Sequence, residues 1–159
     1  MAVEIERKFL LASDAWRDRV EHSMEMKQGY LSRDAQSSVR VRICEGRAQL
    51  GVKSTRDGIY RLEYEYEIPL EEAEELLRLV AHRPIIHKTR HILHHAGHRW
   101  EIDEFHGENA GLVVAEVELA SREEPFEKPA WLGREVSTDA RYYNSNLSKV
   151  PYSAWKDDA

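Results

Sequence analysis

The sequence predicts a mainly β (α+β) fold of about eight strands, with one well-formed helix and two minor ones. Three observations predict it. Apolar and polar residues alternate with a period of two along eight stretches, the pattern of strands with one buried face. One stretch, 70–80, instead repeats its apolar residues at helical spacing. The charged faces of the strands are also sorted by sign, which an ordinary solvated sheet face does not require.

Length and composition narrow the class of protein. A chain of 159 residues has the length of one domain and can bury a core, so residues 1–159 are expected to form a single domain. Acidic residues outnumber Lys and Arg by 29 to 23, which disfavours general binding to nucleic acid. Cys44 is the single cysteine, so no intrachain disulfide can form and a reducing compartment is indicated. Since no stretch has membrane-spanning length and the start lacks an apolar signal core, we expect a cytoplasmic protein.

The expected strands are separated by turn signals along most of the chain. Glu45-Gly46 and Arg56-Asp57-Gly58 mark two of these turns, because glycine and aspartate adopt the backbone angles that tight turns need. The eight expected strands cover residues 3–9, 24–31, 38–43, 48–54, 60–68, 85–93, 99–105 and 112–119.

Three helices are expected between and after the strands. Ser13 can cap a short helix by accepting an amide hydrogen bond in its first turn. Pro69 stands where the main helix, 70–80, would begin, and two glutamates follow in the first turn, where the helix dipole favours them. Asp139 can cap a last short helix. The strand-like alternation fades beyond Pro125.

Like charges occur in pairs two residues apart, so both side chains project from one strand face about 7 Å apart. Neighbouring like charges repel and stabilise nothing by themselves. Acidic and basic pairs could face one another as exposed salt bridges, which contribute little. Alternatively, the strands could curl into a closed barrel with a polar lumen, where acids gather divalent cations and bases gather polyphosphate oxygens. The second arrangement accounts for both signs at once. The acidic pairs are Glu4/Glu6, Glu63/Glu65, Glu101/Asp103 and Glu116/Glu118, and the basic pairs are Arg40/Arg42 and Lys88/Arg90.

The same residues resemble a known family. Glu4-x-Glu6-x-Lys8 resembles the ExExK signature of the CYTH superfamily, the triphosphate tunnel metalloenzymes. The similarity continues in the family's order along nearly the whole chain, and the chain's ending looks like that of short bacterial members. The further matching segments are 28–31, 40–42, 52–53, 61–65, 88–90, 101–103, 116–118 and 135–144.

The resemblance implies an eight-stranded antiparallel closed β-barrel whose tunnel holds a linear triphosphate and one or two Mg²⁺ or Mn²⁺ ions. The small bacterial members look most like tripolyphosphatases, which implies metal-dependent hydrolysis of a phosphoanhydride bond, most of all in inorganic tripolyphosphate. The implied partner is a small-molecule triphosphate, with no nucleic acid and no membrane, for a monomer or homodimer. Thiamine triphosphatase, nucleoside triphosphatase and class IV-type adenylate cyclase activities are the alternatives within the family. A polyphosphate-binding module is the alternative outside the enzymes.

The resemblance also implies roles for the charged residues. We expect water to attack a terminal phosphorus while metal and cations neutralise the developing charge. A metal-bound carboxylate could orient that water, or Tyr30 could if a cation favours its phenolate; Tyr30 as a plain barrel residue is as good an interpretation. The candidate catalytic residues are Lys8, Tyr30 and Lys53. The candidate phosphate-binding residues are Lys8, Arg40, Arg42, Lys53, Arg61, Lys88, Arg90 and Arg141, the last expected to close one tunnel mouth. The candidate metal ligands are Glu4, Glu6, Glu63, Glu65, Glu101, Asp103, Glu116 and Glu118.

Two remaining features have simpler explanations than a functional site. Four histidines surround an expected turn at Ala96-Gly97, and their spacing fits neither a helical HExxH pair nor a Cys/His finger. We therefore expect surface histidines of a hairpin rather than zinc ligands; they are His91, His94, His95 and His98. The helix 70–80 is expected on the outer wall of the barrel rather than as a partner-binding helix.

Overall fold

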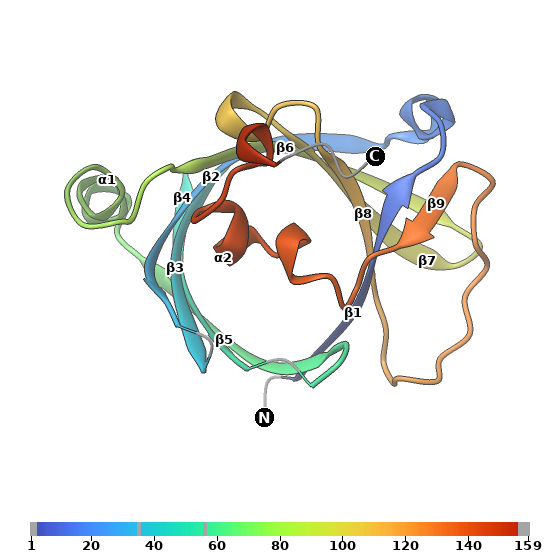
Figure 1. Ribbon diagram of the computed structural model, residues 1–159, viewed down its shortest axis with the longest axis horizontal. Helices are drawn as coiled ribbons and strands as arrows, with labels where there is room; N and C mark the ends of the chain where they lie inside the picture. Colours follow the sequence, from blue (N-terminus) through green and yellow to red (C-terminus); the bar gives the residue numbers. More distant parts are fainter. Residues whose placement is uncertain (1–2, 35, 56, 156–159) are drawn as a thin grey trace.

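The computed structural model describes residues 3–34, 36–55 and 57–155. Arg56 of one expected turn and the first two residues therefore lie outside the described residues. The barrel strands are β1 (Val3–Leu11), β2 (His22–Arg33), β3 (Ser37–Cys44), β4 (Arg47–Ser54), β5 (Tyr60–Ile68), β6 (Ile86–His95), β7 (His98–Phe105) and β8 (Val113–Glu118). They are hydrogen-bonded antiparallel in the order β5-β4-β3-β2-β6-β7-β8-β1, and β1 pairs with β5 to close the ring (Figure 1). The predicted mainly β, eight-stranded closed barrel is confirmed.

A ninth strand, β9 (Leu132–Glu135), lies outside the ring and pairs with the end of β1 (Figure 1). The register between the two strands shifts between Phe9 and Leu11. Gly133 allows the close approach, because a Cβ at this position would lie 2.9 Å from the Leu10 carbonyl oxygen. A strand of four residues is too short to show an alternating pattern in the sequence.

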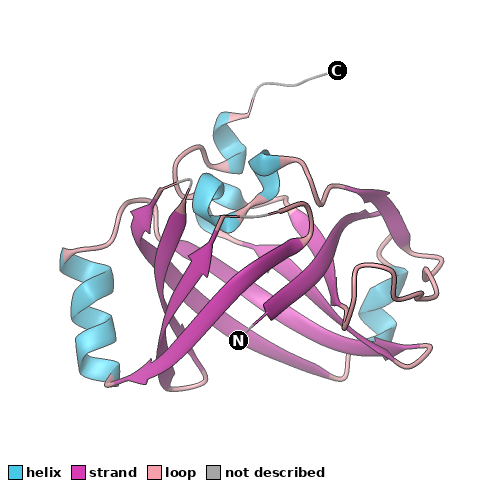
Figure 2. Ribbon diagram, turned by 90° about the horizontal axis from the view of Figure 1, so that it is seen from below, coloured by secondary structure: helices cyan, strands magenta, loops and turns pink. Residues whose placement is uncertain are grey.

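The longest helix lies against the outer wall of the barrel. α1 (Leu70–Leu79) begins directly after Pro69, as predicted, and packs beside β3 and β4 (Figures 1 and 2). The helix expected after Ser13 is a 3₁₀ helix, Ala15–Arg19. Its N-cap residue is Asp14 rather than the predicted Ser13, which stands one residue earlier and accepts the Ala15 amide with its Oγ at 3.3 Å. No helix in the described part of the chain is long and apolar enough to cross a membrane.

The C-terminal part of the chain turns across one end of the barrel (Figures 1 and 2). The last predicted helix is present in two parts, a 3₁₀ turn Ala140–Tyr142 and α2 (Asn144–Leu147). Asp139 accepts the Arg141 amide at 3.1 Å, so its predicted capping role is confirmed. We call residues 136–148 the cap segment. Two further 3₁₀ turns are Gly107–Asn109 and Tyr152–Ala154.

Most of the apolar core lies outside the ring of strands. One cluster, around Trp100, fills the space between the β1–β8–β7 wall and the chain that leads to β9. A second cluster, around Leu77, holds α1 on the outer wall. A third cluster joins barrel residues to Tyr142 and Leu147 of the cap segment. Its other members include Ile86, Phe105 and Val114 on strands, and Leu112 directly before β8. The rest of the inner wall is therefore left to polar and charged side chains.

Candidate active site in the barrel lumen

The alternation of each strand places the sign-sorted charges of the sequence on the inner wall. The strand register brings Lys8 opposite Glu116 and Arg90 opposite Asp103. These side chains surround a cavity of about 60 Å³. The predicted site residues that line it are Glu6, Lys8, Tyr30, Arg40, Arg42, Lys53, Arg61, Glu63, Lys88, Arg90, Glu101 and Glu116.

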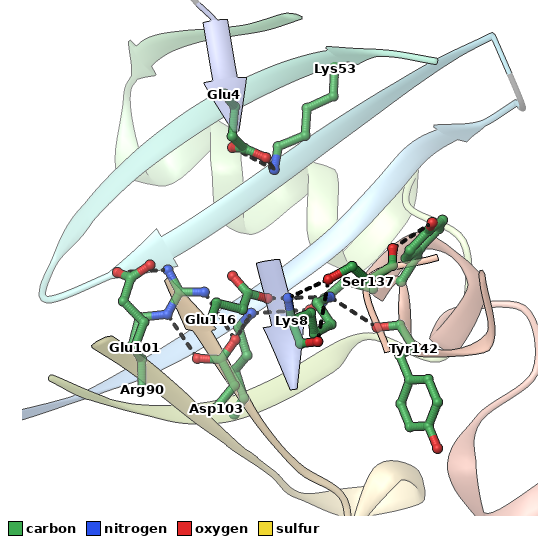
Figure 3. Close-up of polar contacts among 12 residues, drawn as sticks. Glu4, Lys8, Lys53, Arg90, Glu101, Asp103, Glu116, Ser137 and Tyr142 are labelled. Carbon is green, nitrogen blue, oxygen red and sulfur yellow. Dashed lines mark hydrogen bonds and ion pairs between the residues drawn. The ribbon is translucent and has the colours of Figure 1, made fainter. Parts of the chain in front are cut away.

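A buried ion-pair group occupies the wall formed by β6 and β7 (Figure 3). Asp103 is fully buried, and its Oδ2 accepts a hydrogen bond from Lys88 Nζ at 2.8 Å. Arg90 binds both oxygens of the same carboxylate, with Nε at 2.8 Å and Nη2 at 2.9 Å, and its Nη1 reaches Glu101 at 3.3 Å. Burial alone would raise the pKa of Asp103, but Arg90 and Lys88 hold that pKa well below its usual range. Asp103 is therefore the counter-ion that fixes these two cations in place.

Seven cationic and four acidic side chains of the described residues line the cavity. Burial lowers the pKa of Lys88 to about 7, and the cations Arg90 and Arg42 act in the same direction. Burial, followed by repulsion from Arg40, lowers the pKa of Lys53 to about 8. The pKa of Arg42 falls to about 9 for the same two reasons. A bound polyanion would offset this crowding of cations.

Arg40 has few partners of its own. Its side chain is 8% exposed, its ion pair with Glu63 is long at 3.9 Å, and its buried Nε has no hydrogen-bond partner among the described residues. Gly51 lies opposite Arg40 on β4, and a Cβ there would stand 3.4 Å from Arg40 Nη2. The glycine thus leaves room for a guanidinium whose burial is costly until an acceptor binds it.

The two candidate catalytic lysines are held by carboxylates at different places on the wall (Figure 3). Lys8 Nζ lies 3.2 Å from Glu116 and donates to the Tyr142 carbonyl oxygen of the cap segment at 3.1 Å. Lys53 Nζ lies 3.2 Å from Glu4, whose other oxygen accepts from Arg61 Nε at 3.2 Å. Glu4 is therefore paired with two cations, although it was not among the residues that line the cavity.

Carboxylates crowd together where β1, β7 and β8 meet. Burial raises the pKa of Glu118, and the nearby charges of Glu4 and Glu6 raise it further. Burial also raises the pKa of Glu101, and Glu116 adds to the shift although Arg90 opposes it. Burial and Glu6 act to raise the pKa of Glu116, but Lys8 and the basic pair on β6 outweigh them and lower it. Such crowding is what a hard divalent cation would neutralise through oxygen ligands.

The donor set fits a magnesium-like ion that completes its coordination on a substrate. No group of three or more His, Cys, Asp or Glu in the described ranges lies close enough to hold a metal alone. Mg²⁺ binds through one or two carboxylates together with substrate phosphates and water, and therefore does not need such a cage. Glu6, Glu116 and Glu118 offer the oxygens for this arrangement, since Lys88 and Arg90 already engage Asp103.

Five predicted site residues do not line the cavity: Glu4, Glu65, Asp103, Glu118 and Arg141. Glu4 and Asp103 pair with cations of the lumen, whereas Glu65 and Arg141 are largely exposed. Glu65 stands two residues after Glu63 on β5 and is exposed. The Arg141 side chain is 47% exposed and pairs with Asp139 at 2.8 Å. The four hairpin histidines each face a glutamate instead of one another; the pairs are His91–Glu104, His94–Glu21, His95–Glu127 and His98–Glu124.

The cap segment supplies lining residues that were not among the predicted site residues. Tyr143, Asn144 and Ser145 face the cavity from the segment, and Ser38 faces it from β3. Gln28 is fully buried on β2 and bonds Asn144. Gln28 and Asn144 both stand in segments that carried the family resemblance, which was the one signal for them, because neutral amides do not enter a pattern of sorted charge.

A closed antiparallel barrel with a charged lumen, and with most of its apolar core outside the ring, defines the class of tunnel-like β-barrels. The CYTH domain model matches residues 2–154, and the chain belongs to the CYTH domain family. The triphosphate tunnel metalloenzymes of this family depend on metal.

Two relatives and one solved structure are similar to this chain along most of its length. The inorganic triphosphatase of Acetivibrio thermocellus is 48% identical over 157 residues, which cover 99% of this chain and 100% of the relative. The inorganic triphosphatase of Nitrosomonas europaea is 34% identical over 149 residues, covering 91% and 96%. A crystal structure of an inorganic triphosphatase superposes with a TM-score of 0.67 at 33% identity, covering 93% of this chain and 95% of that one.

Proposed function

We propose that this protein is a metal-dependent triphosphatase that hydrolyses a phosphoanhydride bond of a linear triphosphate, most of all inorganic tripolyphosphate, within the barrel lumen. The observation that carries the proposal is the excess of cations over acids around one cavity, where Arg40 Nε has no hydrogen-bond partner in the part of the chain that the structure describes. A short chain of phosphates supplies many acceptor oxygens in line and matches that arrangement. The names of the relatives, both inorganic triphosphatases, support the same substrate.

The basic and acidic residues of the lumen have different roles in the proposed reaction. Arg40, Arg42 and the β6 pair bind phosphate oxygens and neutralise the negative charge that builds up on them as the phosphorus is attacked. A divalent ion, Mg²⁺ or Mn²⁺, held by Glu6, Glu116 and Glu118 supplies further charge neutralisation when it is bound. Lys8 and Lys53 orient the substrate, and either Tyr30 or an acidic side chain takes the proton of the attacking water.

The proposal also covers the domain organisation, the oligomeric state and the cellular compartment of the protein. The chain acts as a single CYTH domain spanning residues 1–159, as a monomer or homodimer. It works in the cytoplasm, where Cys44 stays reduced and the divalent ion and phosphates are at hand.

The main experiment measures phosphate release from three substrates by the purified protein. Tripolyphosphate, ATP and thiamine triphosphate are incubated with Mg²⁺, with Mn²⁺ or with EDTA. We expect fast release from tripolyphosphate with metal, slower release from the two organic triphosphates and none with EDTA. Binding of tripolyphosphate without any release would indicate a polyphosphate-binding module, and preference for an organic triphosphate would reassign the substrate.

Two variants test the site itself. Lys8→Ala removes a phosphate-binding cation, and Glu6→Gln removes a metal-binding charge while keeping the size of the side chain. Each should lower tripolyphosphate hydrolysis by about two orders of magnitude or more, because a buried charged contact contributes several kcal/mol. Circular dichroism should show a folded barrel in both. Near-wild-type turnover in both folded variants would end the lumen mechanism.

A further inference from the structure

Asn144 stands at the point where the cap segment meets the phosphate-binding wall. Its Oδ1 accepts a hydrogen bond from Lys88 Nζ at 3.1 Å and a second from Gln28 Nε2 at 2.9 Å. An amide oxygen has two lone pairs, so both are used. The ammonium of Lys88 is thereby held between Asp103 on β7 and Asn144 on the cap segment.

Gln28 carries the contact onward to the next strand. Its Oε1 accepts from Arg42 Nε at 2.9 Å, so a continuous chain of hydrogen bonds runs from Arg42 through Gln28 and Asn144 to Lys88. These three strand residues come from β3, β2 and β6, which lie side by side in the barrel. Two neutral amides therefore fix the positions of two cations without cancelling their charge.

The other end of the Asn144 amide is available to a ligand. Asn144 lines the cavity, and its Nδ2 makes no hydrogen bond to any described residue, although an amide nitrogen has two hydrogens to donate. We propose that Asn144 is a substrate-binding residue: its Nδ2 donates to a phosphate oxygen while its Oδ1 orients Lys88 and, through Gln28, Arg42. This inference rests on the proposed triphosphatase function and assigns the cap segment a direct part in it.

A purely structural role for Asn144 is less consistent with the surrounding contacts. The cap segment is already anchored by Tyr142 and Leu147 in the apolar cluster. Ser137 Oγ accepts the Lys8 amide at 2.9 Å, and the Ser148 carbonyl accepts from Arg33 Nη1 at 2.9 Å, at the two ends of the segment. Docking of the segment therefore does not require the polar contacts of Asn144.

Three variants of the full-length protein test the proposal. Asn144→Ala removes both ends of the amide. Asn144→Asp keeps an acceptor for Lys88 and Gln28 but replaces the donor with a negative charge that repels phosphate. Asn146→Ala is the matched control, because Asn146 donates from the same segment to the Ala140 carbonyl oxygen at 2.8 Å and does not line the cavity.

The readouts are kcat and KM for tripolyphosphate with metal, the Kd of tripolyphosphate without metal by calorimetry, and Tm. We expect kcat/KM to fall about 10- to 100-fold in Asn144→Ala, the effect of losing hydrogen bonds to a charged group, with KM and Kd rising. Asn144→Asp should bind tripolyphosphate at least as weakly as Asn144→Ala, whereas Asn146→Ala should stay within about twofold of wild type on the same scale. A structural role predicts the reverse order, with Asn144→Asp close to wild type.

The outcomes separate this inference from the proposed function. If the wild-type protein fails to hydrolyse tripolyphosphate, the proposed function fails and the inference with it. If the wild type is active and Lys8→Ala is impaired, but Asn144→Asp keeps wild-type kcat, KM and Kd, the inference alone is overturned. A fall in kcat/KM that Asn146→Ala shares to the same extent, with matching loss of Tm, also overturns it.

Discussion

The same strands form the inner and outer faces of the barrel wall, but the two faces have opposite effects on the stability of the fold. On β7, Trp100 and Ile102 are fully buried on the outside, where they pack against apolar neighbours. Glu101 and Asp103 alternate with them and face the lumen. The outer face supplies the apolar burial that stabilises a fold, while the inner face buries charge, which opposes folding unless it is paired.

Because the two faces differ in this way, substitutions on one face should affect mainly stability and substitutions on the other mainly activity. Side chains can fill the interior of a small closed barrel, and among the described residues an apolar cluster fills the end of this lumen under the cap segment. The middle of the lumen depends on ion pairs such as Arg90–Asp103, whose net contribution to stability is small because desolvation offsets attraction. Substitutions on the outer face should therefore lower the free energy of unfolding with little direct effect on activity. Substitutions on the inner face should lower activity with little effect on the free energy of unfolding.

The largest expected effect is on the outer face at Trp100. Its ring packs against Phe9, Phe126 and Trp131 at centroid distances of 5.7 to 5.9 Å. Trp100→Ala should lower the free energy of unfolding by about 3–5 kcal/mol, because a large buried side chain is replaced by a cavity. Urea denaturation measures this loss. The activity per folded molecule at low temperature should remain close to wild type, and a selective loss of turnover in folded protein would contradict the comparison.

The next effect is on the inner face at Arg40. Arg40→Met should lower kcat/KM for tripolyphosphate about 100-fold, equivalent to about 2.7 kcal/mol, through loss of a bidentate phosphate contact. The free energy of unfolding should stay the same or increase, since an apolar side chain replaces a buried guanidinium whose Nε has no partner among residues 3–34, 36–55 and 57–155.

The control for Arg40 is an arginine outside the barrel. Arg122→Met removes a partly exposed side chain that pairs with Asp57 at 2.9 Å on the surface. Such pairs contribute about 0–1 kcal/mol, so neither kcat/KM nor stability should change by much. If Arg40→Met were as active as Arg122→Met, the inner face would not be the phosphate site.

The same contrast between faces explains what the sequence could predict. The barrel, α1 and most lumen residues were predictable because a strand alternates with period two, so sorted charge at Glu4, Glu6 and Lys8 identifies one face directly. Which acid binds a cation and which one merely pairs was not predictable. Asp103 and Glu101 stand two residues apart with the same parity, yet only Asp103 is enclosed by Lys88 and Arg90.

Structural features that leave no periodic pattern in the sequence could not be predicted from it. The bond from Gln28 to Asn144 joins residues 116 positions apart, and no local signal connects them. Arg141 follows the capping residue Asp139 closely enough to pair with it, and that local pair sets the direction of its side chain away from the cavity. The strand β9 is defined by its pairing with β1 rather than by its own four residues.

A third prediction concerns how closely the outer wall is packed. Gly29 lies on β2 under α1, and a Cβ at this position would stand 2.8 Å from Leu77 Cδ2 and 2.9 Å from both Ala81 and Ile85. Gly29→Ala should lower the free energy of unfolding by about 1–3 kcal/mol, because the helix has to shift away from the wall. Denaturant titration measures it, with Gly46→Ala as a contrast: Gly46 has open space around it and a φ of +75°, so strain rather than crowding governs that site. Suppression of the Gly29→Ala loss by Leu77→Ala would identify crowding as its cause, and no suppression would contradict it.

The smallest effect tests an ion pair on the outer side, where solvent weakens electrostatics. Glu135 on β9 accepts from Arg7 Nε at 2.9 Å and from Ser137 Oγ at 2.6 Å, and the hydrogen bond from Arg7 is the main cause that lowers its pKa from the ordinary value of 4.5. A lowered carboxylate pKa stabilises the folded state above pH 4.5, and this stabilisation is lost as the pH falls through the lower, folded-state pKa. Wild type should therefore exceed Glu135→Gln in unfolding free energy by up to about 1 kcal/mol at pH 6, the scale of a partly exposed pair. That gap should close towards pH 3. A difference between wild type and Glu135→Gln that is constant from pH 6 to pH 3 would show that packing, not the ion pair, joins β9 to the barrel.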